Sequence, residues 1–209
     1  MSISKLKAKA RNDLKGKYEE TIIMLLVYFA ISRVSNYVLA NLNELIGISK
    51  VSALMVEFVL SLALSGIFGY GITSYYLKAS RGEEVTFKEL FSKTNFALPY
   101  IFLSVVTGIF IFLWSLLFII PGIIASISYS LVHFIKLDNP ELNEFEVIRR
   151  SKEMMKGHKM DYLILCLSFI GWEILGVFTF GILYVWLIPY MNVTIANFYN
   201  QLKQEKITF

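Results

Sequence analysis

Six apolar stretches constrain this chain more than any other feature, because a run of about 20 apolar residues matches the hydrocarbon thickness of a bilayer. They cover Thr21–Leu42, Val51–Leu77, Phe96–Ile119, Gly122–Leu137, Tyr162–Phe180 and Leu183–Tyr199. Only Ile120-Pro121-Gly122 separates the third from the fourth. Because proline removes a backbone donor and glycine relieves a turn, we predict a tight hairpin at this point, and another near Gly181. The pattern predicts an all-α polytopic membrane protein whose six transmembrane helices form three hairpins.

The composition argues against the main soluble alternatives. Of the 209 residues, 56% are hydrophobic and 17% are charged, whereas soluble domains average about 45–50% and 25%. A chain of this size buries only about 60–70% of its surface in a water-soluble core. A soluble enzyme and a disordered chain are therefore not expected. Cys166 is the single cysteine, which argues against a disulfide scaffold. The first apolar run is interrupted by Arg33 and lacks a convincing cleavage site, so we interpret it as a retained span.

The basic residues give an independent test of this topology, because cytoplasmic loops are enriched in Lys and Arg. With six spans, 18 of the 20 basic residues fall on one side of the membrane. The opposite side carries only Lys50, and Arg33 lies inside a span. Five or seven spans would destroy this asymmetry. We therefore predict a multi-pass protein with its N- and C-termini in the cytoplasm.

Each hairpin is preceded by a segment with the pattern of a cytoplasmic amphipathic helix. In the first segment, apolar residues recur three and four positions apart between lysines. The second begins with a capping box, Thr86-Phe87-Lys88-Glu89, and the third ends at Gly157. Residues 10–16 also parallel residues 151–157. We predict one membrane domain over residues 1–209, built from repeats at 1–80, 81–138 and 139–209.

Small or polar residues recur every fourth position in the second helix of the hairpins, where they would let helix backbones approach closely. The alternative is that membrane helices are rich in small residues in any case. The candidate helix-packing residues are Ser61, Ser65, Gly69, Thr73, Gly122, Ser126, Ser130 and Ala196.

Three ionisable residues lie well inside the predicted spans: Arg33, Glu57 and Glu173. At about 1.5 Å per residue, all three lie in the outer half of the membrane, roughly 9–14 Å from its outer side. Since a charge in the bilayer needs a partner or a purpose, one interpretation is a structural ion pair between Arg33 and Glu57. Another is an outer vestibule in which a carboxylate binds a proton, a cation or an amine, and Tyr190, Asn192 and Thr194 would extend this polar cavity. Misplaced span boundaries are the third interpretation.

Motifs for catalysis or cofactor binding are not found. The chain has no HExxH, GxSxG, Walker or GxGxxG pattern. His133, His158 and the remote Cys166 do not form a metal-ligand pattern. We therefore expect no enzyme activity, no cofactor and no metal. The basic residues are explained by topology, so we expect no nucleic-acid partner. Basic amphipathic helices instead favour the anionic lipids of the inner leaflet.

Several motifs resemble one bacterial family of membrane proteins. They are Asp138-x-Pro140, Ser151-x-x-x-Met155-x-Gly157-x-Lys159, Phe169-Ile170-Gly171-Trp172, Thr179-x-Gly181 and Pro189-Tyr190-x-x-x-Thr194-x-Ala196-x-x-Tyr199. The family is domain of unknown function 975. The resemblance implies a six-span protein of the bacterial plasma membrane and implies no reaction or ligand. A fainter likeness connects the spans with the membrane portion of glycerophosphodiester phosphodiesterases.

These observations lead to one functional hypothesis and one alternative. The first is a non-enzymatic protein of the plasma membrane that organises, senses or supports the bilayer, with a membrane-protein partner or a second copy as further candidates for contact. The alternative is a small transporter or permease that uses Arg33, Glu57 and Glu173.

Overall fold

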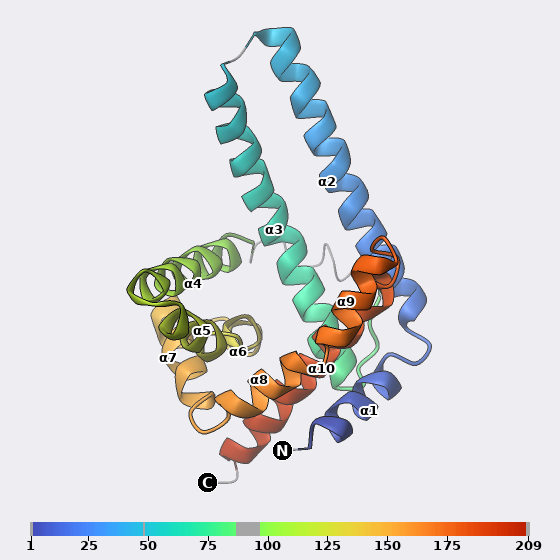
Figure 1. Ribbon diagram of the computed structural model, residues 1–209, viewed down its shortest axis with the longest axis vertical. Coiled ribbons are helices and arrows are strands. Elements are labelled where there is room, and N and C mark those ends of the chain that lie inside the picture. Colours follow the sequence, from blue (N-terminus) through green and yellow to red (C-terminus); the bar gives the residue numbers. More distant parts are fainter. Residues whose placement is uncertain (1, 48, 87–96, 208–209) are drawn as a thin grey trace.

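The computed structural model describes residues 2–47, 49–86 and 97–207. These residues form ten α-helices and no strand, as expected from the apolar pattern. The predicted capping box at residues 86–89 falls largely outside the described residues. Figure 1 shows two long helices that project from a cluster of shorter ones, and α1 and the C-terminal part of α10 lie together at the opposite end.

The N-terminal helix α1 (Ile3–Asp13) is amphipathic, as its sequence predicts. Leu6 and Ala10 on this helix, and Leu14 just after it, are buried, while the lysines between them face outward or toward neighbouring helices. The chain then turns at Gly16, whose φ of +78° suits a residue without a Cβ. The apolar face of α1 therefore covers the core at the basic end of the molecule.

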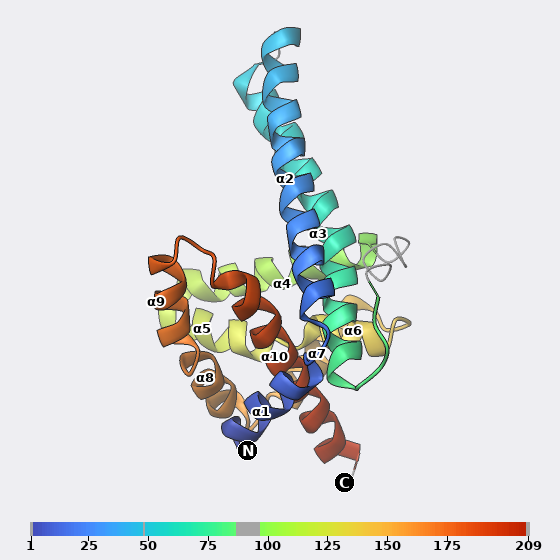
Figure 2. The same ribbon diagram turned by 90° about the vertical axis from the view of Figure 1, so that its right-hand side faces the viewer.

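The two longest helices, α2 (Tyr18–Ile46) and α3 (Lys50–Ser80), run side by side (Figures 1 and 2). With 31 residues, α3 extends about 46 Å, which exceeds the hydrocarbon core of a bilayer. Gly47 has a positive φ at the turn, and the Ser49 hydroxyl accepts a hydrogen bond from the Ser52 backbone N–H. The turn that joins these two helices therefore ends in a serine whose hydroxyl caps the N-terminus of α3.

The next helices, α4 (Ala97–Leu117) and α5 (Ile119–Ser128), pack closely against each other and lie crosswise to α2 and α3 (Figure 2). The predicted position of their turn was wrong by a few residues, since the break lies at Phe118, the extended residue before α5. Pro121 and Gly122 lie inside the first turn of α5 instead. A proline fits that position because the first N–H groups of a helix have no partner within the helix.

The remaining helices are shorter. They are α6 (Val132–Asp138), α7 (Glu144–Met154), α8 (Lys159–Leu167) and α9 (Ile170–Phe178), followed by the longer α10 (Tyr184–Ile207). Interruptions at Tyr129–Leu131 and Ser168–Phe169 divide the fourth and fifth predicted spans. The chain turns at Phe180 and Gly181, both with positive φ, close to the predicted position.

The segments around α1 and α7, which are parallel in sequence, also share local structural features. Both helices have 11 residues, and each ends three residues before a glycine with positive φ, Gly16 or Gly157. Leu14 and Met155 occupy equivalent positions and both are fully buried. The second proposed repeat cannot be compared in this way, because its amphipathic segment lies largely outside the described residues.

The apolar core lies at the basic end, where α10 packs against its neighbours through Ala196, Phe198 and Tyr199. Elsewhere, large apolar side chains face outward, and Phe180 is 98% exposed. Four described helical stretches are long and apolar enough to cross a membrane: Leu54–Ser80, Ala97–Leu117, Ile119–Asp138 and Lys159–Phe178. These helices are compatible with a membrane-embedded protein. The sequence prediction of six spans adds α2 and α10 and stays a prediction.

Candidate functional site: a polar network at the basic end

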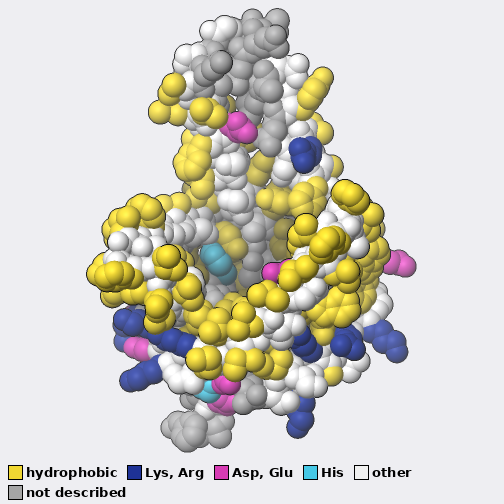
Figure 3. All heavy atoms as spheres, viewed as in Figure 1, with side chains coloured by type: hydrophobic (Ala, Val, Ile, Leu, Met, Phe, Trp, Pro, Cys, Tyr) yellow, Lys and Arg dark blue, Asp and Glu magenta, His cyan; other side chains and the backbone are white. Residues whose placement is uncertain are grey.

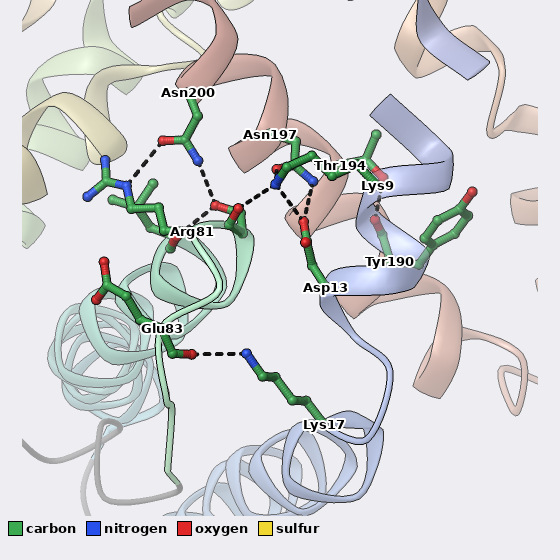
Figure 4. Close-up of polar contacts among 11 residues, drawn as sticks. Lys9, Asp13, Lys17, Arg81, Glu83, Tyr190, Thr194, Asn197 and Asn200 are labelled. Carbon is green, nitrogen blue, oxygen red and sulfur yellow. Dashed lines mark hydrogen bonds and ion pairs between the residues drawn. The ribbon is translucent and has the colours of Figure 1, made fainter. Parts of the chain in front are cut away.

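Polar side chains from α1, α3, α6 and α10 form a continuous network at the basic end of the fold. Figure 4 shows its part around Lys9, Asn197 and Asn200. The segments involved are far apart in sequence, and each contributes one face or one end of a helix. The network therefore depends on the tertiary fold.

The first part of the network surrounds the Lys9 ammonium group. It donates to Asp13 Oδ2 at 2.9 Å, to Asn197 Oδ1 at 2.5 Å and to the Ser80 carbonyl at 2.6 Å. The Asn197 amide nitrogen also donates to Asp13 Oδ2 at 2.8 Å. Lys9 and Asp13 can meet because they are four residues apart on α1. Ser80 ends α3, and its carbonyl is one of those without a partner inside the helix, so a cation is favourable at this position.

The second part surrounds the Asp138 carboxylate at the end of α6, whose side chain is only 8% exposed. Arg81 donates two hydrogen bonds to it, Nη1 to Oδ1 at 2.9 Å and Nη2 to Oδ2 at 2.6 Å. Lys203 Nζ and the Tyr199 hydroxyl donate to Oδ2 at 2.6 and 2.8 Å. Burial alone would lower the pKa of Arg81, but the hydrogen bonds and charge of Asp138 outweigh burial and raise that pKa.

Asn200 connects the two parts. Its amide oxygen accepts from Arg81 Nε at 3.2 Å, and its amide nitrogen donates to the Ser80 hydroxyl at 2.8 Å. The side chains enclose one side of a cavity of about 860 Å³. Its walls are formed by Leu6, Lys9, Asp13, Ser80, Arg81, Gly82, Asn197, Asn200, Gln201, Lys203 and Gln204. Because carboxylates already neutralise much of the positive charge, the arrangement is suited to holding helices together and to hydrogen-bonding polar groups.

Other basic residues of the N-terminal segment also bind backbone carbonyls. Lys17 Nζ donates to the Glu83 carbonyl at 2.9 Å, and Lys7 Nζ donates to the Ser168 carbonyl at 2.9 Å while lying 3.8 Å from the centre of the Phe169 ring. Burial and then the nearby charge of Arg11 lower the pKa of Lys7. Several lysines that sequence reasoning assigned to the lipid surface therefore fasten the N-terminal segment to the rest of the protein.

The three residues of the predicted intramembrane cluster lie on three different helices. Arg33 and Glu57 are exposed on α2 and α3, and Glu173 is half-buried on α9. Among the described residues, no ion pair joins any two of these three side chains. The Tyr184 hydroxyl donates to the backbone carbonyl of Glu173, which leaves the carboxylate outside this contact.

The residues predicted to extend a polar cavity all lie on α10. The Asn192 amide donates to the Ile188 carbonyl, and the Thr194 hydroxyl donates to the Tyr190 carbonyl, so both are bonded to their own helix. The Tyr190 hydroxyl accepts from Arg11 Nε at 3.4 Å. These contacts place Tyr190 beside α1, at the basic end.

The predicted packing residues occupy mixed environments. Gly122 lies against Ser115 of α4, Gly69 lies against the Tyr100 ring, and Ala196 is fully buried. Thr73 and Tyr100 share a hydrogen bond of 3.2 Å. Four other predicted packing residues donate their hydroxyls to backbone carbonyls of their own helical segments. Three of them are exposed, Ser61, Ser65 and Ser126, and Ser130 is half-buried.

Sequence reasoning did not identify the network as a site, although the sequence contains two signals of it. Asp138 and Tyr199 belong to the motifs that carried the family resemblance, and Asn197 is an amide in an otherwise apolar stretch. Within the described residues, no group of three His, Cys, Asp or Glu side chains could hold a metal ion.

Comparison with known proteins supports the resemblance seen in the sequence. The family described as "Protein of unknown function (DUF975)" matches residues 1–128 and 116–206. These two matches together cover nearly the whole chain. No curated protein and no solved structure matches it, so the fainter likeness to glycerophosphodiester phosphodiesterases stays a prediction.

Proposed function

The chain belongs to the DUF975 family, and on this premise we propose that it is a non-enzymatic integral membrane protein that organises or supports the inner leaflet of a bacterial plasma membrane. It holds a basic cytoplasmic face against anionic lipid headgroups. The distribution of charge over the surface carries this proposal. Figure 3 shows Lys and Arg side chains gathered near one end, next to a broad apolar surface.

This separation of charged and apolar surface matches the two environments at a membrane boundary. Apolar side chains such as Leu98, Phe112 and Val177 face outward from helices that are long enough to cross a bilayer. In water, so much exposed apolar surface would favour aggregation. In a bilayer it contacts lipid, and the basic end lies at the cytoplasmic interface, in agreement with the positive-inside rule.

The proposed topology has six spans and places both termini in the cytoplasm. It adds α2 and α10 to the four most apolar stretches. Buried residues of α10, including Val193, Ala196 and Phe198, contact protein, so this helix does not need an apolar surface on every side. The turns at Phe118 and Phe180 are apolar, which supports their placement at the outer membrane boundary rather than in water.

The polar network gives this membrane protein a fixed cytoplasmic face. Lys9 and Asn197 fasten α1 to α10, and Arg81 and Asp138 fasten the end of α3 to the end of α6. These side chains are bonded to one another, which supports a role in assembly rather than in catalysis. An anchored basic helix presents its exposed Lys5 to the leaflet in a defined geometry.

Cysteine accessibility tests the topology. Single-cysteine variants in a Cys166→Ser background are treated with a membrane-impermeant maleimide in intact and permeabilised cells. We expect Ser49→Cys to react in intact cells, and Lys15→Cys and Lys156→Cys to react only after permeabilisation. The apolar turn variants Phe118→Cys and Phe180→Cys should react more weakly than Ser49→Cys.

Two outcomes would contradict the proposal. Reaction of Lys15→Cys in intact cells would reverse the orientation of the basic face. Reaction of Phe118→Cys or Phe180→Cys exclusively from the cytoplasmic side would overturn the six-span topology.

A further inference from the structure

A groove beside α7 and α8 combines two surfaces of different chemistry. Its cationic part has a volume of about 460 Å³ and is lined by Arg149, Lys152, Glu153, Lys156 and Lys159. Its apolar part has a volume of about 270 Å³ and is lined by Trp114, Pro121, Ile124, Ala125, Ser128, Tyr129, Lys152 and Lys159. Lys152 and Lys159 line both parts, so the charged part and the apolar part adjoin each other.

The three lysines of this groove differ from those of the N-terminal segment. Across the part of the chain that the structure describes, no hydrogen bond or ion pair is formed by the side chains of Lys152, Lys156 and Lys159. Arg149 is already paired, with Glu146 at 2.5 Å and Glu153 at 3.2 Å. The groove therefore keeps three ammonium groups that an anion can neutralise.

Local packing places Lys152 and Lys159 beside the apolar part. The Ser151 hydroxyl is buried and donates to the Ser128 carbonyl at 2.9 Å, which fastens α7 to the end of α5. Lys152 is the next residue after Ser151. Pro121, Ile124 and Ser128 follow one face of α5, and this face extends about 10 Å from its first to its last residue. Trp114 of α4 completes the far part of the groove.

We propose that this groove binds one anionic phospholipid, with its phosphate against Lys152, Lys156 and Lys159 and an acyl chain along α5 toward Trp114. The inference rests on the proposed membrane location. A phosphate headgroup complements the lysines, and a hydrocarbon chain complements the apolar wall, so a single lipid satisfies both parts. A free phosphate would leave the apolar part uncovered, and a zwitterionic headgroup would bring its own cation to the lysines.

The position of Trp114 provides a direct test, because bromine atoms on an acyl chain quench tryptophan fluorescence only at close contact. The full-length Trp172→Phe/Trp186→Phe protein keeps Trp114 as its only tryptophan. It is reconstituted into phosphatidylcholine vesicles that contain a low fraction of brominated phosphatidylglycerol or brominated phosphatidylcholine. We expect the brominated phosphatidylglycerol to quench Trp114 at a much lower fraction than the brominated phosphatidylcholine.

Removing the groove charges should abolish this selectivity. At about 1 kcal/mol for each lysine at an anionic surface, the double variant Lys152→Gln/Lys159→Gln should reduce the preference for phosphatidylglycerol about tenfold or more. The matched variant Lys5→Gln/Lys15→Gln removes the same charge from exposed positions on the N-terminal segment, and it should retain the preference. Circular dichroism of each variant checks that the helices remain folded.

The possible results separate the lipid site from the wider proposal. Equal quenching by both brominated lipids, or equal loss in both double variants, would overturn the site while leaving the membrane topology intact. Equal quenching by both brominated lipids, together with a change in Trp114 emission on adding millimolar inorganic phosphate but not equimolar chloride, would show a site for free phosphate and would also overturn the lipid site. Extraction of the protein from membranes by alkaline carbonate would instead contradict the proposed function itself.

Discussion

Arg81 and Asp138 form a two-bond ion pair that joins the end of α3 to the end of α6, with distances of 2.9 and 2.6 Å. Lys203 and Tyr199 bind the same carboxylate, so one side chain connects three helical segments. Asp138 is nearly inaccessible, and two cations depend on it for neutralisation. This carboxylate therefore contributes more to stability than an exposed ion pair does.

The first prediction concerns this carboxylate. Asp138→Asn keeps the side-chain volume but removes the charge that Arg81 and Lys203 share. We expect a loss of about 2–3 kcal/mol in the free energy of unfolding, measured by denaturant titration in detergent. Glu153→Gln, which affects an exposed pair with Arg149, should change it by less than about 1 kcal/mol. Equal effects of the two substitutions would show that Asp138 contributes no more to stability than a residue of an exposed ion pair does.

The second prediction concerns the attachment of α1. Lys9→Met keeps the aliphatic stem and removes three hydrogen bonds, to Asp13, Asn197 and the Ser80 carbonyl. Amide hydrogen exchange in residues 3–13 should accelerate about tenfold, because a hydrogen bond to a charged group contributes about 1.5–3 kcal/mol. The comparison is Lys5→Met on the exposed face of the same helix. Unchanged exchange in Lys9→Met would mean that apolar packing alone holds α1.

The third prediction concerns alkaline pH. Burial and Arg11 place the pKa of Lys7 below its usual value of 10.5. Between the lowered pKa and 10.5, the unfolded chain binds more protons at this site than the folded chain does. The contribution of Lys7 to stability therefore rises with pH through this window and is lost as pH falls through the lowered pKa.

The measurement compares thermal unfolding of the wild type and Lys7→Met between pH 8 and 10.5. The difference in Tm between them should shift in favour of the wild type as the pH rises. A difference in Tm that is constant over this range would contradict the lowered pKa of Lys7. The variant Lys5→Met corrects for the general effect of removing one lysine.

The fourth prediction concerns the close approach of α4 and α5. A Cβ added at Gly122 would overlap the Ser115 side chain and press against its Cα. Gly122→Ala should therefore destabilise the protein by about 1–3 kcal/mol. Gly108→Ala is the matched control on α4, where a new Cβ meets no atom within 4 Å and gains helix propensity. Similar stability of the two variants in chemical denaturation would exclude tight packing at Gly122.

Sequence periodicity predicted the helices and the amphipathic character of α1 and α7 because these properties depend on residues close together in the chain. The helix end at Gly157 was predicted for the same reason, and Gly16 occupies the parallel position in the first segment. The break at Phe118 was not, because proline is compatible with the first turn of a helix as well as with the turn before it. Local patterns thus locate an apolar hairpin but not the residue at which it reverses.

The network of Lys9, Asp138 and Asn197 could not be predicted in the same way. Lys9 is more than a hundred positions from Asp138 and from Asn197, and each of the three residues also fits an ordinary interfacial residue. Arg33, Glu57 and Glu173 were expected to lie together because their depths in the predicted spans are similar, and the described residues show no ion pair between any two of them. Equal depth fixes one coordinate along the membrane normal, whereas an ion pair also requires the helices and the side-chain directions to match.

The last prediction follows from this separation and concerns transport. Because the described residues show no ion pair among Arg33, Glu57 and Glu173, we expect no shared charge-binding site among them. In proteoliposomes with an imposed proton or sodium gradient, the wild type, Glu57→Gln and Glu173→Gln should all give the flux of protein-free vesicles. A flux present in the wild type and removed by either glutamine would contradict this expectation. It would establish the carboxylate as part of a pathway and make transport the function to pursue.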